Sequence, residues 1–393
     1  MSNTPFDRNP DLRRLRDEGF DLALSASNNH LLVRKVPYLA SATEVRYGTL
    51  ITVLNQSGDL LNPPKDHVVY FIGDQPRNLD GSVIAGIFNG EAPRDLDKDL
   101  RSDRTFSGKP DTPFQSYYDK ITRYVRILES PARVVNPSVD ARTFPPYEMT
   151  VNDSVFKYAD TASSRAHIAA LSGRLEANKI AIVGVGGSGS YILDFLAKAP
   201  IKEIHIFDGD VFSSHNAFRA PGAASLETLR TRPTKAAYHK AVYENIRHTV
   251  IAHEYNVTAE NVGELDEMEF VFLSMDGGDD KRIVVEHLRA KGIGFIDVNM
   301  GLDADCDAVA GLVSLTTCTG TKSDHIGNRL SFAEPNADDE YDSNIQIVEL
   351  NALNAALAVI KWKKLRGFYA TIDNEHFTVY TVRANSLINA DVA

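Results

Sequence analysis

A glycine-rich loop with charged residues beyond it is the part of this sequence best suited to chemistry. The segment GVGGSG contains Gly184, Gly186, Gly187 and Gly189, between an apolar stretch and an apolar helical pattern. Glycine lets backbone N–H groups approach a polyphosphate closely, and the start of the following helix adds partial positive charge. We therefore expect a phosphate-binding loop.

Two aspartates, Asp208 and Asp210, follow the loop at the end of the next apolar stretch, in IFDGD. An acidic side chain about 20 residues beyond such a loop can accept hydrogen bonds from ribose hydroxyls. We assign both aspartates to a nucleotide site. The pattern does not define the reaction, because NAD-dependent oxidoreductases and nucleotide-binding proteins without redox chemistry share it.

One amide and two cations come next, in the order Asn216, Arg219 and Lys235. Hydride transfer does not need this set, whereas in-line displacement at a phosphate uses such groups to hold developing negative charge. Asp276 follows a third apolar stretch, in FLSMDGG, and could hold Mg²⁺ through its hard oxygen ligands. These residues predict phosphate chemistry.

Each charged residue also has a simpler structural interpretation. Arg219 could pair with Asp210, Lys235 could be a solvated helix charge, and Asp276 could cap the helix that follows it. Their combination after a glycine loop favours the phosphate site.

The elements that must position these residues alternate between strand and helix beyond residue 161. Apolar or alternating stretches occur in KIAIVGVGG, KEIHIFDGD, EFVFLSMDGG and GIGFIDVNM, and the helical stretch SYILDFLAKAP separates the first two. Continuous apolar runs are typical of central strands buried on both faces of a parallel sheet. We predict an α/β domain over residues 151–393, with a Rossmann-like, doubly wound and mainly parallel sheet.

Residues 1–150 follow a different pattern and predict a smaller α+β domain. Short strands separated by turn residues are expected at residues 31–36, 48–54, 67–72 and 83–88. An amphipathic helix is expected from Pro113 to Pro131, where a proline should end it. Four prolines within residues 131–155 then suit a connection, and we place the boundary near Val151.

The composition excludes several classes of protein. The net charge of −11 argues against a broad nucleic-acid surface, which needs clustered Lys and Arg. The N-terminal segment lacks the apolar core of a secretory signal, and no stretch approaches the roughly 20 apolar residues that span a bilayer. With only two cysteines there is no disulfide framework. We expect a cytoplasmic protein that binds neither membrane nor nucleic acid.

The complete pattern resembles the ThiF-type adenylyltransferases, which include the ubiquitin-activating enzymes and enzymes of molybdopterin and thiamine biosynthesis. The resemblance covers roughly residues 160–370 and rests on GVGGSG, on DGD followed by NAFR, on a lysine after Pro-Thr and on the later Asp. It implies that the glycines cradle the phosphates of ATP and that Asp208 binds the ribose. It also implies that Asn216, Arg219 and Lys235 stabilise the transferring phosphate and that Asp276 binds Mg²⁺.

The same resemblance implies a reaction and partners. In the family a carboxylate, normally the C-terminal glycine of a ubiquitin-like protein, attacks the α-phosphate of ATP to give an acyl adenylate and pyrophosphate. A homodimer is implied, in which an arginine of the second subunit completes the site; Arg165 is the candidate and Arg174 the competing choice. In PYLA, VRYGTL and PPKDHVVYF, residues 1–150 resemble an uncharacterised domain that precedes bacterial ThiF-type modules, a likeness that assigns no activity. The fusion to the adenylation module suggests docking of the substrate protein or of a downstream transfer protein.

Three alternatives stay open at this point. The glycine loop would also serve an NAD-dependent oxidoreductase. A ThiF-type enzyme could instead act on a tRNA or on a sulfur carrier. A binding module could retain nucleotide contacts without catalysis, but it would not need Arg219, Lys235 and Asp276.

The two cysteines bear on the step after adenylation. Cys318 begins a polar segment that we expect to be an exposed crossover loop, where a mobile nucleophile could form a thioester, with Lys322 and His325 near in sequence. An ordinary structural cysteine is the alternative. Cys306 lies between two aspartates, which disfavour its thiolate. Simpler family members carry two C-x-x-C pairs that bind zinc, and the chain has none, so no zinc is expected.

Overall fold

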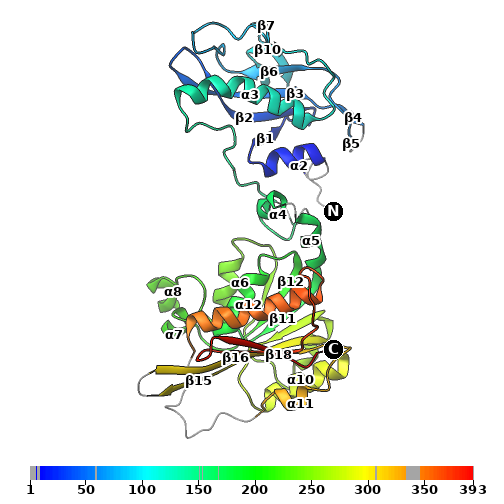
Figure 1. Ribbon diagram of the computed structural model, residues 1–393, viewed down its shortest axis with the longest axis vertical. Helices are drawn as coiled ribbons and strands as arrows, with labels where there is room; N and C mark the ends of the chain where they lie inside the picture. Colours follow the sequence, from blue (N-terminus) through cyan, green and yellow to red (C-terminus); the bar gives the residue numbers. More distant parts are fainter. Residues whose placement is uncertain are drawn as a thin grey trace. The chain divides into compact units, whose positions relative to one another are not determined.

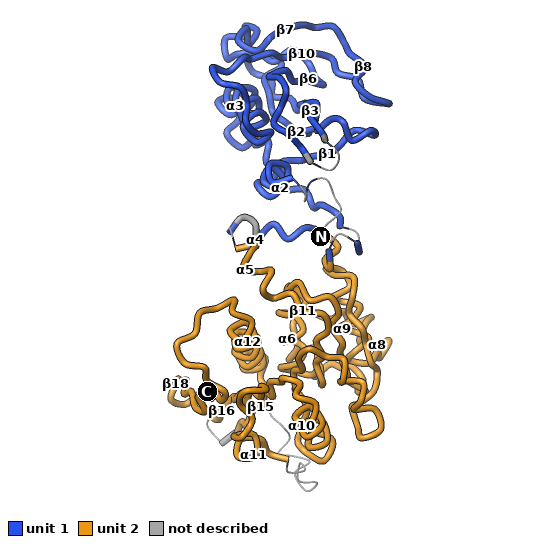
Figure 2. The backbone as a smooth tube through the Cα atoms, turned by 90° about the vertical axis from the view of Figure 1, so that its right-hand side faces the viewer, with its two compact units in different colours: residues 1–154, 159–167 blue, residues 155–158, 168–393 orange. Residues whose placement is uncertain are grey.

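The protein was analysed as a computed structural model that describes residues 6, 9–57, 60–149, 151–152, 154–166, 168–305, 308–332 and 346–392. The chain divides into two compact units (Figure 2). The first comprises residues 1–154 and 159–167, and the second comprises residues 155–158 and 168–393. Each unit is considered by itself below.

The first unit contains short strands and a long helix. Its elements are α2 (Pro10–Asp17), β1 (Asp21–Leu24), β2 (His30–Leu39), β3 (Val45–Val53), β4 (Gln56–Ser57), β5 (Leu60–Leu61), β6 (Val68–Ile72), β7 (Phe88–Gly90), β8 (Arg94–Asp97), β9 (Leu100–Ser102), β10 (Arg104–Ser107), α3 (Tyr117–Val135) and α4 (Thr161–Arg165).

An antiparallel sheet with the order β1-β2-β3-β6-β10-β7 forms the centre of this unit. Helix α3 packs against β2 and β3. Alternate strand residues such as Leu31 and Val33 face the helix side chains Ile121, Tyr124 and Leu128 in one buried cluster. The predicted small α+β domain is confirmed.

Two of the predicted elements in this unit differ in an instructive way from those observed. Helix α3 continues through Pro131 to Val135, although proline removes one intrahelical hydrogen bond. Ala132 is fully buried against Leu39 and Val139, so packing holds the last turn. Of the expected strand at residues 83–88, only Phe88 belongs to a strand, and Val83 forms an isolated bridge with Arg77.

The second unit alternates strands and helices. Its elements are α5 (Ala169–Ser172), η1 (Gly173–Leu175), β11 (Ala177–Val183), α6 (Gly187–Leu196), β12 (Ile201–Phe207), α7 (Ser214–Ala217), α8 (Leu226–Thr231), α9 (Lys235–Tyr243), β13 (Val250–His253), η2 (Val262–Glu267), β14 (Phe270–Leu273), α10 (Asp279–Lys291), β15 (Gly294–Asp305), β16 (Ala308–Cys318), α11 (Ile326–Arg329), α12 (Val348–Leu365), β17 (Phe377–Thr381) and β18 (Ser386–Ala390). Within the described residues of both units, no helix combines the length and apolar character needed to cross a membrane.

The sheet of the second unit has the order β13-β12-β11-β14-β15-β16-β17-β18. The first five strands are parallel, and β16 to β18 extend the sheet in antiparallel fashion. Strand order reverses at β11, because β12 lies on one side of it and β14 on the other, which is the arrangement that creates a ligand crevice in doubly wound folds. The predicted mainly parallel, Rossmann-like sheet is confirmed.

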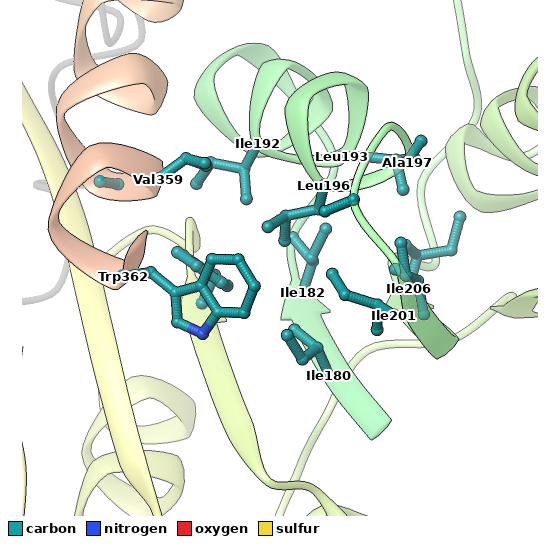
Figure 3. Packing of buried hydrophobic residues seen from close by; sticks show 14 of the residues in the cluster. Ile180, Ile182, Ile192, Leu193, Leu196, Ala197, Ile201, Ile206, Val359 and Trp362 are labelled. Carbon is teal, nitrogen blue, oxygen red and sulfur yellow. The ribbon is translucent and has the colours of Figure 1, made fainter. Parts of the chain in front are cut away.

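Helices cover both faces of this sheet (Figure 1). Ile180 and Ile182 of β11 point into a core that includes α6 and α12, with Trp362 as its largest side chain (Figure 3). The alternate residues Ala181 and Val183 point into a second core formed with α10. Burial on both faces explains why the sequence of β11 is apolar without interruption.

Candidate nucleotide-binding site

A pocket of about 280 Å³ opens at the carboxyl ends of the parallel strands, where the strand order reverses. Its walls come from the loops after β11, β12 and β14, from β15 and from the residues that begin α12. Most of the predicted site residues line this one pocket: Gly184, Gly186, Gly187, Asp208, Asp210, Arg219, Lys235 and Asp276.

The glycine loop connects β11 to α6 through a conformation that demands glycine. Gly184 has a φ of +86°, and a Cβ there would lie 2.2 Å from the carbonyl oxygen of Ser274. Gly187 is the first residue of α6, whose ten residues direct the positive end of their dipole at the pocket. Gly189 lies inside α6, and its Cβ would lie 1.9 Å from the carbonyl oxygen of Gly184. It allows close packing and does not line the pocket.

Asp208, at the end of β12, is connected to both sides of the site. Its Oδ2 accepts a hydrogen bond of 2.9 Å from the backbone N–H of Val185 in the glycine loop, and its Oδ1 accepts one of 3.0 Å from the N–H of Asp210. Burial raises the pKa of Asp208, and the nearby ammonium of Lys235 opposes this shift. The carboxylate therefore fixes the loop beside the position that we predicted for the ribose.

Lys235 begins α9, after a Thr234 cap that accepts a hydrogen bond from the N–H of Ala237. Its Nζ lies 2.6 Å from Oδ2 of Asp210 and 3.6 Å from Oδ1 of Asp208. Only 8% of the residue is exposed, so the ammonium is held in place and is not a solvated helix charge. This excludes the simpler interpretation of Lys235.

Arg219 and Asp276 face the pocket from different elements. Burial lowers the pKa of the Arg219 guanidinium, while the carboxylates of Asp276 and Asp208 favour its charge. Its Nε has no hydrogen-bond partner in the described part of the chain. The sequence left open an ion pair between Arg219 and Asp210. In the structure Asp210 pairs with Lys235 instead. The N-cap of α10 is Gly278, two residues beyond Asp276.

Asn216 is fully buried in the short helix α7 and is absent from the residues that line the pocket. Its Oδ1 accepts hydrogen bonds of 3.0 Å from the backbone N–H and the hydroxyl of Ser213. Its Nδ2 has no partner among the residues that the structure describes. Asn216 thus orders the segment that carries Arg219, and its contact with a phosphate stays a prediction.

The two candidate arginines for a second subunit lie just before β11. Arg165 ends α4, and its side chain is outside the described part of the structure. Arg174 lies in η1, where its Nη1 donates a hydrogen bond of 2.6 Å to the carbonyl of Gly367. The guanidinium of Arg174 is therefore used within its own chain, whereas the role of Arg165 stays a prediction.

Cys318 does not lie in an exposed loop, and this prediction was wrong. It is the last residue of β16, paired with Phe295, and only 3% of it is exposed. It belongs to the core beneath α10, and burial raises the pKa of its thiol to about 11. A buried, protonated thiol is a poor nucleophile. Cys306 lies outside the described residues.

Several polar residues of the pocket were not identified from the sequence. They are Ser188, Asn256, Asp280, Asn299, Gln346 and Asn351. Asn256 accepts a hydrogen bond of 2.9 Å from the N–H of Gly209 and so holds the turn between the two aspartates. One signal was available, because Asn351 and Asn354 interrupt an otherwise apolar helical pattern.

The acidic residues of the pocket suit a hard cation. Asp276 and Asp280 both line it, and Mg²⁺ commonly binds to one or two carboxylates together with substrate phosphates. No group of three or more His, Cys, Asp or Glu side chains able to hold a metal ion occurs within the described ranges. The donor set therefore fits Mg²⁺ shared with a nucleotide and does not form a complete protein cage.

Fold and site together define a Rossmann-like nucleotide-binding protein whose pocket is lined by two cations and several carboxylates. The chain belongs to the ThiF family, whose model matches residues 164–386. Residues 10–161 match a domain of unknown function, DUF6791. Family membership confirms the resemblance and supports an activity of the adenylyltransferase type.

Solved structures similar to this chain include MccB of E. coli and PaaA. The structure of MccB is 16% identical with a TM-score of 0.46, over 59% of this chain and 70% of that chain. Selenomethionine PaaA is 16% identical with a TM-score of 0.44, over 58% of this chain and 77% of that chain. MccB with ATP is 16% identical with a TM-score of 0.43, over 57% and 66%. No curated protein matches the sequence significantly.

Proposed function

We propose that this protein uses ATP to adenylate the C-terminal carboxylate of a ubiquitin-like protein. The observation that carries the proposal is the meeting of Arg219, Lys235 and Asp276 with the glycine loop in one pocket. Hydride transfer to or from a nicotinamide needs no such set. Membership of the ThiF family supports the same class of reaction.

Each group of residues in the pocket has a separate role in the proposed transfer of the adenylyl group. The glycine loop and the N-terminus of α6 bind the phosphates, and Asp208 lies where the ribose hydroxyls would bind. The carboxylate of the substrate forms a bond to the α-phosphorus while the bond to the pyrophosphate oxygen breaks. Arg219 and Lys235 hold the negative charge that develops on the phosphate oxygens. Asp276 and Asp280 would hold Mg²⁺, which neutralises phosphate charge when bound.

The proposed reaction ends at the acyl adenylate and pyrophosphate, because the burial of Cys318 argues against this thiol as the nucleophile for a thioester. In the active form, a second copy of the chain supplies Arg165 to the site. The first unit docks the substrate protein or a downstream transfer protein. These assignments extend the proposal beyond the pocket.

Isotope exchange between pyrophosphate and ATP tests the reaction. The substrate to test is any small protein with an exposed C-terminal glycine whose gene neighbours the gene for this chain. Exchange should be negligible without a carboxylate substrate and fastest with that protein. Asp276→Ala or Lys235→Ala should reduce it by at least about 100-fold, as for other groups that stabilise a transition-state charge. Lys240→Ala is the matched control, because Lys240 lies on the same helix in an exposed pair with Glu244. Unchanged exchange in both site variants would refute the assignment.

Ligand titration separates the proposal from an oxidoreductase. ATP with Mg²⁺ should bind and NADH should not, since the pocket offers two cations and carboxylates for Mg²⁺ to a terminal triphosphate, which NADH lacks. Tight binding of NADH without binding of ATP would overturn the proposal. Exchange that depends on a tRNA or a sulfur carrier, and not on the ubiquitin-like protein, would retain the chemistry and change the substrate.

A further inference from the structure

Two side-chain amides lie directly over the first turn of α6. If Gly187 carried a Cβ, that atom would lie 2.3 Å from Nδ2 of Asn351 and 2.4 Å from Oε1 of Gln346. Both residues line the nucleotide pocket. Asn351 is held by Ser188, whose hydroxyl donates a hydrogen bond of 3.0 Å to its Oδ1. The amides thus form a wall beside the glycine loop, in which Asn351 is held in place by Ser188.

A third amide continues this wall along α12. Asn354 follows Asn351 by three residues, so both lie on the same face of the helix. Its Nδ2 donates a hydrogen bond of 3.0 Å to the carbonyl of Asn299 on β15, and Asn299 also lines the pocket. Asn351 and Asn354 are each only 1% exposed. The wall therefore connects the phosphate loop to β15.

Several atoms of these amides are buried without a hydrogen-bond partner in the described portion of the chain. They are Nδ2 of Asn351, Oε1 of Gln346 and Oδ1 of Asn354. Buried polar groups are nearly always paired, so the two unpaired atoms of the pocket-lining residues Asn351 and Gln346 indicate a ligand. That ligand must offer both an acceptor and a donor. Pyrophosphate offers only acceptors, whereas a peptide group offers one of each.

The position of the wall agrees with a peptide. Asp208 lies on the β12 side of the glycine loop, and the amides lie on the β15 side, because the sheet order is β12-β11-β14-β15. A nucleotide with its ribose at Asp208 and its phosphates at the loop leaves the amide side to the group that attacks the phosphorus.

We propose that Asn351 and Gln346 bind the last peptide group of the substrate, with Asn351 Nδ2 donating to its carbonyl and Gln346 Oε1 accepting from its N–H. The amide wall would then select a polypeptide C-terminus over a free carboxylic acid. This inference rests on the proposed adenylation and adds the residues that determine its specificity.

The test compares two small carboxylates in pyrophosphate–ATP exchange by the full-length protein. One is acetyl-glycyl-glycine, and the other is its ester analogue, in which oxygen replaces the last peptide N–H. Wild-type protein should reach half-maximal exchange at an about tenfold lower concentration of the amide, the ratio that one buried hydrogen bond provides. Gln346→Ala should remove this difference and leave the half-saturating concentration of ATP unchanged. Asn351→Ala should weaken both carboxylates, and the exposed Asn245→Ala is the matched control.

The outcomes separate the inference from the reaction that it assumes. If the wild-type protein used acetyl-glycyl-glycine and its ester equally well, the role of Asn351 and Gln346 would be contradicted, but the proposed adenylation would not. A higher requirement for ATP in Gln346→Ala or Asn351→Ala, with unchanged carboxylate dependence, would assign the wall to the nucleotide and overturn the inference. Absence of exchange with either carboxylate, in protein that binds ATP, would contradict the proposed activation of a peptide and this inference with it. Thermal melting identifies a variant that fails to fold, and Gln346→Ala, at a half-buried site, is the less disruptive of the two.

Discussion

At the scale of single residues, Gly184 illustrates how tightly the backbone constrains the phosphate loop. Gly184→Ala would place a Cβ 2.2 Å from the carbonyl oxygen of Ser274 at a φ of +86°. We expect the free energy of unfolding to fall by about 3 kcal/mol, from left-handed strain and steric overlap together. Urea denaturation measures it, with Gly263→Ala as the control, because nothing lies within 4 Å of a Cβ there. Equal stability of the two variants would show that the loop moves freely.

A buried ion pair beneath the pocket connects α10 to β15. Nζ of Lys281 lies 2.8 Å from Oδ1 of Asp297, and both side chains are almost completely buried. Asp297→Ala should lower the free energy of unfolding by about 3–5 kcal/mol, because it leaves an uncompensated buried ammonium. The double substitution Lys281→Met with Asp297→Leu should be less destabilising than Asp297→Ala. Glu244→Ala, in an exposed pair, should cost at most about 1 kcal/mol. If the losses in the free energy of unfolding from substituting Lys281 and Asp297 were additive, the two residues would not be coupled.

His239 makes stability depend on pH. Burial lowers its pKa to about 4, and it hydrogen-bonds the backbone of Val185 in the glycine loop. In the unfolded chain the pKa of this histidine is near its ordinary value of about 6.5. The unfolded chain therefore binds the proton more readily, and the free energy of unfolding should fall by roughly 3 kcal/mol as the pH falls from about 6.5 to 4. His239→Gln should show a shallower loss over this range in urea denaturation at several pH values. The same slope in both proteins would exclude His239 as the cause.

At the scale of elements, α6 is held at its C-terminal end by one buried guanidinium. Nη1 of Arg247 lies 3.3–3.4 Å from the carbonyl oxygens of Leu196, Ala197 and Ala199, and Nη2 donates to the carbonyl of Ile201. The residue is fully buried, and burial lowers its pKa to about 10. These bonds pair the carbonyls that a helix end leaves free.

Removing this guanidinium should loosen the helix that begins the phosphate site. We expect Arg247→Met to reduce the free energy of unfolding by about 3 kcal/mol, because several buried carbonyls lose their donor. Lys198→Ala is the control, since its exposed pair with Asp194 on α6 contributes at most about 1 kcal/mol. Chemical denaturation measures both variants, and a loss for Arg247→Met no larger than that of the control would contradict this role.

At the scale of the whole molecule, the residues that line the nucleotide pocket all belong to the second unit. Each unit has its own hydrophobic core. A fragment comprising residues 155–393 should therefore fold and bind ATP within about threefold of the full chain, as expected of an independent domain. It must begin at residue 155, because the N–H of His248 bonds the carbonyl of Val155. Calorimetric titration with ATP measures the affinity, and a fragment that folds without binding ATP would show that the first unit completes the site.

Local sequence patterns were sufficient for the glycine loop and the strands that carry it. The apolar run of β11 predicts burial on both faces, and glycine at 184 predicts a backbone that other residues do not tolerate. Both features depend on neighbours in the chain, so the sequence by itself determined the class of fold and the position of the glycine loop.

Contacts between distant segments decided the rest. The pairing of Asp210 with Lys235, and not with Arg219, depends on where α9 begins relative to β12. Cys318 is buried because β16 pairs with β15 and α10 covers that face of the sheet. The polar residues that follow Cys318 had suggested an exposed loop instead. Asn351 reaches the pocket only because α12 packs beside α6. Tertiary structure alone brings such residues together, because their separation in sequence leaves no local pattern.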